Sequence, residues 1–240
     1  MKKIISLVIV VQAALAFAAG PGSALGKPRP DSILKPDTQK GKIVFVNAQK
    51  DENVTKWAGE HVSYIGEFLR ITTEIKNGTF DLQKPDLQGD ATVFIVDDEK
   101  LPMSLVACEA KWAMVNVNSL KTDKPVFHEA RVKKMIIRVF STLCGAACSQ
   151  YPHSYTSSAT KAEDVDTFAT TEFVVDVAAK IPRYIEAFGV RQGLYYPYSR
   201  ACKEGWAPAP TNDLQKATWN RVHELPTNPI KIEFDPKTDK

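Results

Sequence analysis

The sequence predicts an α/β (α+β) sandwich, in which a mixed, mostly parallel sheet carries packed helices and the C-terminal half is helical. Short apolar runs of β-forming residues and long amphipathic segments follow one another in the order β-α-β-β-β-α, and mainly helical periodicity follows. The 240 residues are 44% hydrophobic and 25% charged. This is the composition of a globular protein with enough chain to bury a core.

The first 18 residues predict a signal peptide. Lys2 and Lys3 form a positive start, residues 4–15 are almost wholly apolar, and a small-x-small pattern ends at Ala18. The apolar run is shorter than the ~20 residues that a membrane-spanning helix needs. We therefore expect cleavage near Ala18, export to the periplasm or the exterior, and no membrane span in the mature chain.

Three further segments are predicted after the signal peptide. Residues 19–41 contain four prolines with scattered Lys, Gly and Ser, which predicts a flexible leader. Residues 42–168 should form the α/β core. Residues 169–240 should form a helical subdomain that packs on this core.

A buried strand and a long helix open the predicted core. Residues 42–47 are a compact apolar run of β-formers, which is typical of a buried strand. Asp51 or Asn53 can cap a helix that starts there, because both side chains accept hydrogen bonds from the first free amides. Apolar residues then recur at helical spacing as far as Leu69.

Three more strands are predicted, at residues 71–75, 91–96 and 112–117. Asn77-Gly78 follows the first of them and is a strong turn signal, so this segment should form a hairpin or an edge strand. No glycine-rich phosphate loop follows any strand, so nucleotide binding is not expected.

Helical periodicity dominates the second half of the chain. Pro182 should kink the second of its helices and Gly189 should end it. Apolar and charged residues alternate over residues 230–234, which predicts an edge strand or a surface segment. The three helices are expected at residues 130–147, from Thr170 or Thr171 through 188, and from Thr211 or Asn212 through 223.

The four cysteines leave their pairing open. An exported chain permits disulfides, and four cysteines allow three pairings, while free buried thiols are an equal alternative. Cys144 and Cys148 share a helix face, but a bridge between them would be strained unless Gly145 breaks the helix. With His153 they are a conceivable zinc site, although the spacing matches no standard finger. The remaining cysteines are Cys108 and Cys202.

The order of elements resembles the N-terminal half of the metzincin zinc peptidases, and the archaemetzincin branch in particular. The active helix of that family carries H-E-x-x-H-x-x-G-x-x-H-C before a Met-turn. The matching segment here reads RVFSTLCGAACS, with Gly145 on the family glycine. The zinc-histidine positions hold Arg138, Thr142 and Cys148. The position of the general-base Glu holds Val139.

The resemblance covers residues 42–166 and implies a peptidase fold without its metal chemistry. Zinc catalysis needs imidazole ligands and a carboxylate that takes the proton of water. Residues 154–156 would occupy the Met-turn region and contain no methionine. We expect neither conventional zinc catalysis nor a cofactor. The resemblance implies a substrate cleft beside Arg138 and Thr142, which we expect to bind a peptide or a glycoprotein.

Two pairs of carboxylates suggest an alternative, an active acid-type peptidase. Asp97 and Asp98 end a predicted strand, and Asp164 and Asp166 lie two residues apart. Two carboxylates held close together can share a proton, as in aspartic peptidases. The simpler interpretation is that the first pair is solvated and that Thr160 starts a capping box with the Glu three residues later.

An aromatic segment in the C-terminal region is a candidate recognition surface, because aromatic residues are common in binding hot spots. Packing of these rings on their own core is the alternative. The stretch 200–210 resembles exported proteins of mucin-degrading gut bacteria, which implies a mucin-like host ligand. A structural or envelope-associated role is the third hypothesis. The net charge of only +3 argues against nucleic acid as a partner. The aromatic residues are Tyr195, Tyr196, Tyr198 and Trp206.

Overall fold

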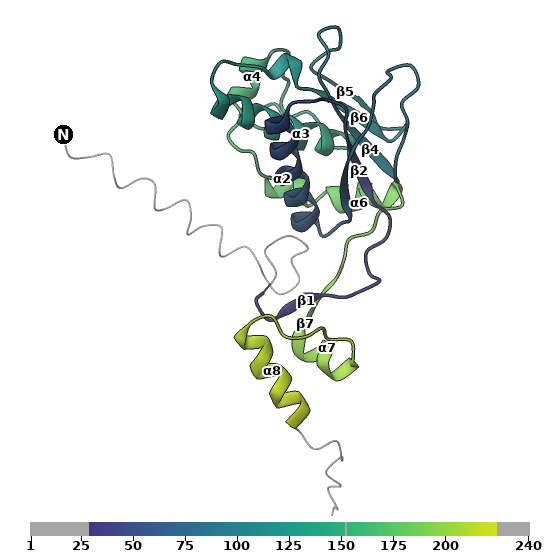
Figure 1. Cartoon of the computed structure of the whole chain (residues 1–240), viewed down its shortest axis with the longest axis vertical. Coiled ribbons are helices and arrows are strands. Elements are labelled where there is room, and N and C mark those ends of the chain that lie inside the picture. Colours follow the sequence, from purple (N-terminus) through teal and green to yellow (C-terminus); the bar gives the residue numbers. More distant parts are fainter. Residues whose placement is uncertain (1–28, 152, 225–240) are drawn as a thin grey trace, which may run out of the picture. The chain divides into compact units, whose positions relative to one another are not determined.

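The structure is a computed structural model that describes residues 29–151 and 153–224. These residues form two compact units, one of residues 36–194 and one that joins 29–35 to 195–224 (Figure 1). The boundary predicted at residue 168 therefore lies inside the first unit. The predicted signal peptide and the predicted strand at 230–234 lie outside the described residues. No helix within the described part is long and apolar enough to cross a membrane.

A five-stranded sheet forms the centre of the first unit (Figure 1). The strands lie in the order β3-β2-β4-β6-β5, and every neighbouring pair is parallel except β5 and β6. The predicted mixed, mostly parallel sheet is confirmed. The sequence pattern missed β5, which is a short, half-buried strand. The strands are β2 (Ile43–Asn47), β3 (Thr73–Asn77), β4 (Ala91–Val96), β5 (Ser104–Ala107) and β6 (Trp112–Asn116).

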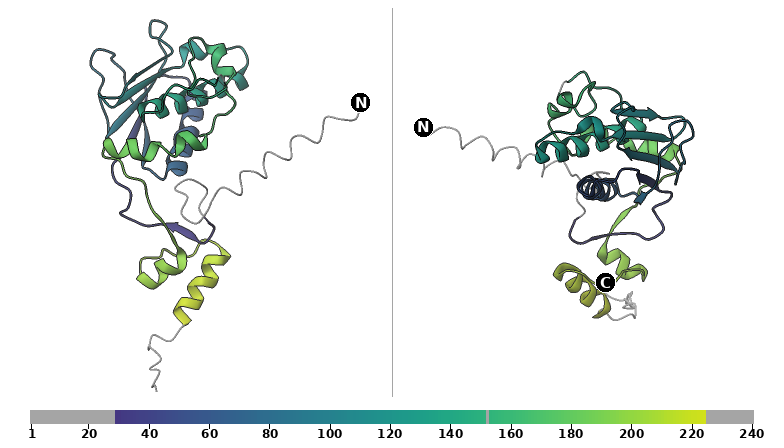
Figure 2. Two further views of the ribbon diagram at one scale, coloured as in Figure 1. Left: turned by 180° about the vertical axis from the view of Figure 1, so that it is seen from behind. Right: turned by 45° about the horizontal axis from the view of Figure 1, so that its top comes forward.

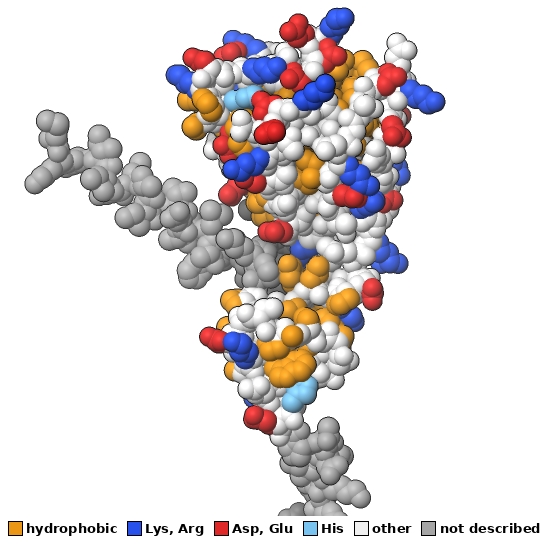
Figure 3. Space-filling view, in the orientation of Figure 1, with side chains coloured by type: hydrophobic (Ala, Val, Ile, Leu, Met, Phe, Trp, Pro, Cys, Tyr) orange, Lys and Arg blue, Asp and Glu red, His pale blue; other side chains and the backbone are white. Residues whose placement is uncertain are grey.

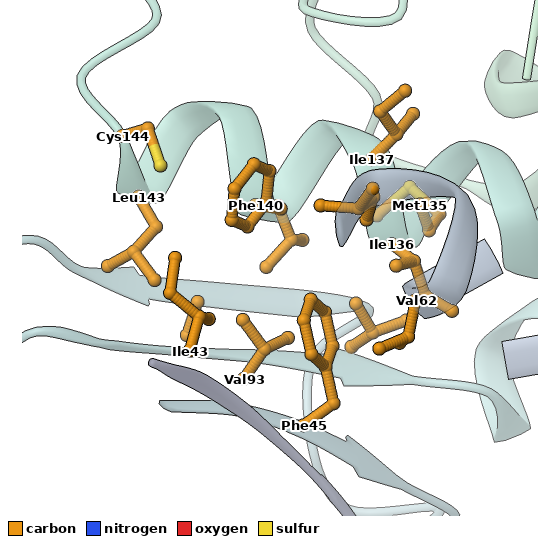
Figure 4. Packing of buried hydrophobic residues seen from close by; sticks show 14 of the residues in the cluster. Ile43, Phe45, Val62, Val93, Met135, Ile136, Ile137, Phe140, Leu143 and Cys144 are labelled. Atoms are coloured by element: carbon orange, nitrogen blue, oxygen red, sulfur yellow. The ribbon is translucent and has the colours of Figure 1, made fainter. Parts of the chain in front are cut away.

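Both faces of the sheet are covered, which explains why β2 and β4 are apolar at nearly every position. Helices α2 (Glu52–Leu69) and α3 (Pro125–Leu143) lie on one side of the sheet (Figure 2). Ile43 and Phe45 point to this face (Figure 4). On the other face, Phe94 packs with four further buried residues. Phe80, from the loop after β3, covers it with a ring separation of 4.8 Å.

Helix α2 begins where the sequence predicted. Of the two predicted caps the structure uses Asp51, whose carboxylate accepts hydrogen bonds from the amides of Asn53 and Val54 at 2.8 and 3.3 Å. The next strand, β3, pairs only with β2 and is an edge strand. The hairpin alternative at Asn77-Gly78 is therefore wrong. The chain leaves β3 through a long loop that crosses to β4.

Helix α3 starts five residues earlier than predicted, at Pro125, and ends at Leu143. Proline is well suited to the first turn of a helix, where no amide hydrogen is needed. Gly145 follows the helix with φ +78°, in the left-handed region that favours glycine. A Cβ atom on Gly145 would lie 2.7 Å from the ring of Tyr184. The glycine therefore sets both the end of the helix and the close approach of this ring.

Replacing Gly145 with alanine is expected to lower the free energy of unfolding by about 1–2 kcal/mol, from backbone strain and from displacement of Tyr184. Gly59→Ala in α2 is the matched control, because a Cβ there meets nothing within 4 Å. The control should stabilise by about 0.5–1 kcal/mol. Urea unfolding followed by circular dichroism measures both variants. Equal effects would contradict the assignment of Gly145 as a required left-handed residue.

The single helix predicted from Thr170 or Thr171 through 188 is wrong. The structure has two short helices there, α5 (Val175–Ala178) and α6 (Ile181–Ala187). Pro182 lies in the first turn of α6, so it begins a helix instead of kinking one. Gly189 follows α6 with φ +94°, as the predicted stop requires.

The second unit pairs the N-terminal and C-terminal segments. Strand β1 (Ser32–Leu34) runs antiparallel to β7 (Tyr195–Pro197), and α7 (Tyr198–Glu204) and α8 (Asp213–Glu224) follow. Part of the predicted leader therefore forms a strand. With three residues, this strand is too short to show the alternation of apolar and polar residues that predicts a strand. Of the two predicted caps of α8, the structure uses Asn212, whose side-chain oxygen Oδ1 accepts a hydrogen bond from the backbone amide of Gln215 at 2.9 Å.

Candidate functional site

A pocket of about 440 Å³ opens at the C-terminal end of α3. The segment that follows α3 forms one wall, and α5 and α6 with the residues around them form the other. The lining residues are Cys144, Ala146, Ala147, Cys148, Ser149, Tyr151, Ser154, Thr156, Val174, Val177, Lys180 and Ile181.

The lining of the pocket combines apolar side chains with a few polar groups. Val174, Val177 and Ile181 belong to the apolar part, and hydroxyl groups come from the segment 149–156. Lys180 adds one cation. No carboxylate occurs among the described lining residues. Such a pocket can bury an apolar group and accept a negative charge at its edge.

The wall that follows α3 is held in place by its own hydrogen bonds. The Ser149 amide donates to the Thr156 carbonyl at 3.1 Å, and the hydroxyls of Ser154 and Thr156 lie 2.9 Å apart. Tyr155 between them is fully buried and anchors the segment to the core. Burial raises the pKa of Tyr155 to about 12, so its hydroxyl is protonated at neutral pH.

Arg138 and Thr142, the predicted binding residues of the first unit, are engaged with the backbone. The Nε atom of Arg138 donates to the Ser157 carbonyl at 3.2 Å, and the Thr142 hydroxyl donates to the Arg138 carbonyl at 2.9 Å. Neither residue lines the pocket, whereas Cys148 does. Val139, at the position of the family's general base, is fully buried in the core.

The residue types at these positions do not fit a zinc ion. Burial lowers the pKa of Arg138, with an opposing effect from Cys148, but a guanidinium is still a cation at neutral pH. His153 is exposed, and its Nδ1 atom lies 3.0 Å from the Thr167 carbonyl. Within residues 29–151 and 153–224, no three His, Cys, Asp or Glu side chains form a group that could hold a metal ion.

The first predicted carboxylate pair is held at the end of β4. Partial burial opposes ionisation of Asp97, but hydrogen bonds from Asn118 at 2.7 Å and Lys121 at 3.0 Å outweigh it and lower the pKa of Asp97. The Asp98 carboxylate accepts from the Lys100 amide at 2.8 Å. Both side chains therefore stabilise the turns at this edge of the sheet.

The second pair belongs to the short helix α4 (Ala162–Asp166). Asp164 accepts hydrogen bonds from the amides of Thr160 and Lys161, which lower its pKa. The capping acid is thus Asp164, and not the Glu163 predicted. The hydrogen bond from Arg131 lowers the pKa of Asp166. All four predicted catalytic carboxylates lie outside the pocket lining.

The predicted aromatic residues lie in the second unit, whose visible face gathers hydrophobic side chains (Figure 3). The rings of Tyr196 and Trp206 are perpendicular at 6.0 Å, and the ammonium of Lys35 lies 5.3 and 5.6 Å from their centres. Tyr195 is half-buried in β7. Tyr198 is fully buried and donates to the Pro208 carbonyl at 2.6 Å, so it belongs to the core of this unit.

Sequence reasoning missed one wall of the pocket. Val174, Val177 and Lys180 lie three residues apart and would share a face of the predicted continuous helix, but the sequence does not show that this face borders a pocket. The proline at position 182 was the available signal, because it marks a helix start as readily as a kink.

No protein-family model and no curated protein matches this sequence. Among solved structures, an archaemetzincin from Methanopyrus kandleri matches 64% of this chain and 99% of its own, with a TM-score of 0.53 and 13% identity. An archaemetzincin from Archaeoglobus fulgidus in complex with malonate covers 58% of this chain and 99% of its own, with a TM-score of 0.47 and 12% identity. The first likeness supports a metallopeptidase-like fold, and at this identity it concerns the fold alone.

Proposed function

We propose that residues 36–194 form a peptide-binding unit with a metallopeptidase-like fold that works without zinc catalysis. The observation that carries the proposal is the pocket at the end of α3. Its apolar lining can bury a peptide side chain, and its hydroxyl groups can bond the peptide backbone. Lys180 favours a ligand with a carboxylate, either from an acidic residue or from an acidic sugar.

The position of the pocket supports the same proposal. Cys148 lines it at the position that the family resemblance assigns to the third zinc ligand. Ser154 and Thr156 line it from the Met-turn region. In this proposal the substrate cleft of a peptidase fold binds a ligand without cleaving it. Arg138 and Thr142 do not contact the ligand, because their side chains donate hydrogen bonds to backbone carbonyls. We further propose that the protein is exported and that mucin-like glycopeptides are among its ligands.

Fluorescence anisotropy with labelled mucin glycopeptides, before and after glycan removal, tests this function. We expect saturable binding that Ala147→Trp weakens by about tenfold or more, because the indole fills the pocket from an exposed position. Ala187→Trp is the matched control, since it places the same ring at an exposed site on α6 outside the lining. The control should bind like the unchanged protein.

Two outcomes would contradict peptide binding in this pocket. Equal binding by the two tryptophan variants would place the ligand elsewhere, and no binding of any glycopeptide would favour the structural or envelope-associated role. Mucin cleavage at acidic pH that persists in chelator and is lost in Asp97→Asn or Asp164→Asn would instead establish the acid-peptidase alternative.

A further inference from the structure

Two cysteines of the first unit meet at the C-terminal end of α3. Cys144 caps the helix and is buried, with 1% of its surface exposed. Cys108 is exposed and lies in the turn between β5 and β6. Strand β5 packs against α3, so residues far apart in the chain are brought together here.

The Cys108 thiol reaches the last turn of the helix. It donates to the Thr142 carbonyl with a sulfur–oxygen distance of 3.5 Å, and Thr142 is only two residues before Cys144. Burial raises the pKa of the Cys144 thiol, and the neighbouring Cys108 adds to this rise. The Cys108 sulfur therefore lies beside the last turn of α3, which leads directly into Cys144.

Cys148 is a poorer partner for Cys144. Gly145 turns the chain after the helix, and the Ala146 amide closes this turn on the Ser141 carbonyl at 2.9 Å. The thiol of Cys148 is exposed, and its sulfur lies 3.9 Å from the Ser149 carbonyl oxygen. Cys108, by contrast, contacts the end of the helix itself through the Thr142 carbonyl.

We propose that Cys108 and Cys144 form an intramolecular disulfide on oxidation, which ties the β5–β6 turn to the end of α3 beside the pocket. The exposed Cys108 thiolate attacks a low-molecular-weight disulfide, such as oxidised glutathione, and displaces one glutathione thiolate. The Cys144 thiol then gives up its proton to the glutathione thiolate just released, and its sulfur attacks the Cys108 sulfur and displaces the second glutathione thiolate. Two glutathione thiols form, and the two thiol protons of the protein pass to them through the solvent.

Peptide mapping of the full chain tests the pairing. The protein is oxidised with oxidised glutathione, its free thiols are blocked with iodoacetamide, and it is digested with trypsin without reduction. We expect a cross-link between the peptide that ends at Lys111 and the peptide that begins at Val139. Since the second peptide holds both Cys144 and Cys148, Cys148→Ser must keep the cross-link and Cys144→Ser must lose it.

The melting temperature provides a second readout. Oxidation should raise the melting temperature of the Cys148→Ser protein by about 5–10 °C, because the bridge constrains the unfolded chain. Cys108→Ser should show no such rise. A cross-link that survives in Cys144→Ser, a bridge within the second peptide alone, or free thiols after complete oxidation of the glutathione buffer would overturn the proposal.

Discussion

Replacement of Asp166 by alanine is expected to lower the free energy of unfolding by about 3 kcal/mol. Arg131 is only 7% exposed in its side chain, and its Nε and Nη2 atoms bond both oxygens of Asp166 at 2.8 and 2.6 Å. Its Nη1 atom faces the carbonyls of Leu120 and Lys121. Without the carboxylate, a buried cation keeps its desolvation cost and loses its counter-ion.

Glu163→Ala is the matched control for this loss. Glu163 lies 3.9 Å from the same guanidinium, but 66% of its side chain is exposed, so its removal should cost about 0.5 kcal/mol or less. Denaturant unfolding followed by circular dichroism compares the two variants. Equal losses would mean that Asp166 does not hold Arg131, and Asp166 would again be a candidate for a catalytic role.

The pH dependence of this stabilisation has a definite sign. Because Arg131 lowers the pKa of Asp166 in the folded state, the stabilisation is complete above the unfolded value of about 3.9. It is lost as the pH falls through the lower folded value. The difference in stability between the unchanged protein and Asp166→Ala should be constant from pH 5 to 7 and shrink below about pH 4.

Protonation of His61 at low pH does not change the difference in stability between the unchanged protein and Asp166→Ala. Burial, with a smaller effect from Lys133, lowers the pKa of His61 to about 4. The folded protein thus resists protonation of His61 and loses stability as the pH falls between 6.5 and about 4. This loss is shared by both proteins and cancels in their difference.

The buried strands could be predicted from the sequence because both faces of the sheet are covered. Residues 43–46 and 93–96 are continuous apolar runs, and residues 112–115 form a third such run in β6. Strand β5 left no such pattern, because its four residues are half-buried. The turn that joins it to β6 uses Lys111 at φ 58°, a residue type that gives no turn signal.

The contacts of the candidate site residues also could not be predicted from the sequence. The sequence identified Asp97 and Asp166 as carboxylates of interest, but not the bases that hold them. Arg131 and Lys121 are distant in the chain, and only the packing of α3 on α4 and of β4 on β6 brings them close. Residue type alone could not separate a catalytic acid from an ion-pair partner.

Replacement of Asn116 by alanine should cause the second large loss in the free energy of unfolding. Asn116 is fully buried at the end of β6, and its amide group donates to the carbonyls of Asp98 and Leu101 at 2.7 and 2.8 Å. Its carbonyl accepts from the amides of Asp98 and Asn118 at 3.2 Å each. Asn116→Ala should therefore cost about 3 kcal/mol, since several backbone groups lose partners and a small cavity opens.

Asn118→Ala is the matched control for Asn116→Ala, because it removes a nearby side-chain amide that does not bond the loop carbonyls. Asn118 is half-buried and its amide bonds the exposed Asp97 carboxylate, so its loss should cost about 1 kcal/mol or less. Denaturant unfolding ranks the two variants. If Asn116→Ala is no worse than Asn118→Ala, water satisfies the loop carbonyls and the edge is open to solvent. The expected larger loss means that Asn116 holds the Asp97-Asp98 turn from inside the carboxyl edge of the sheet.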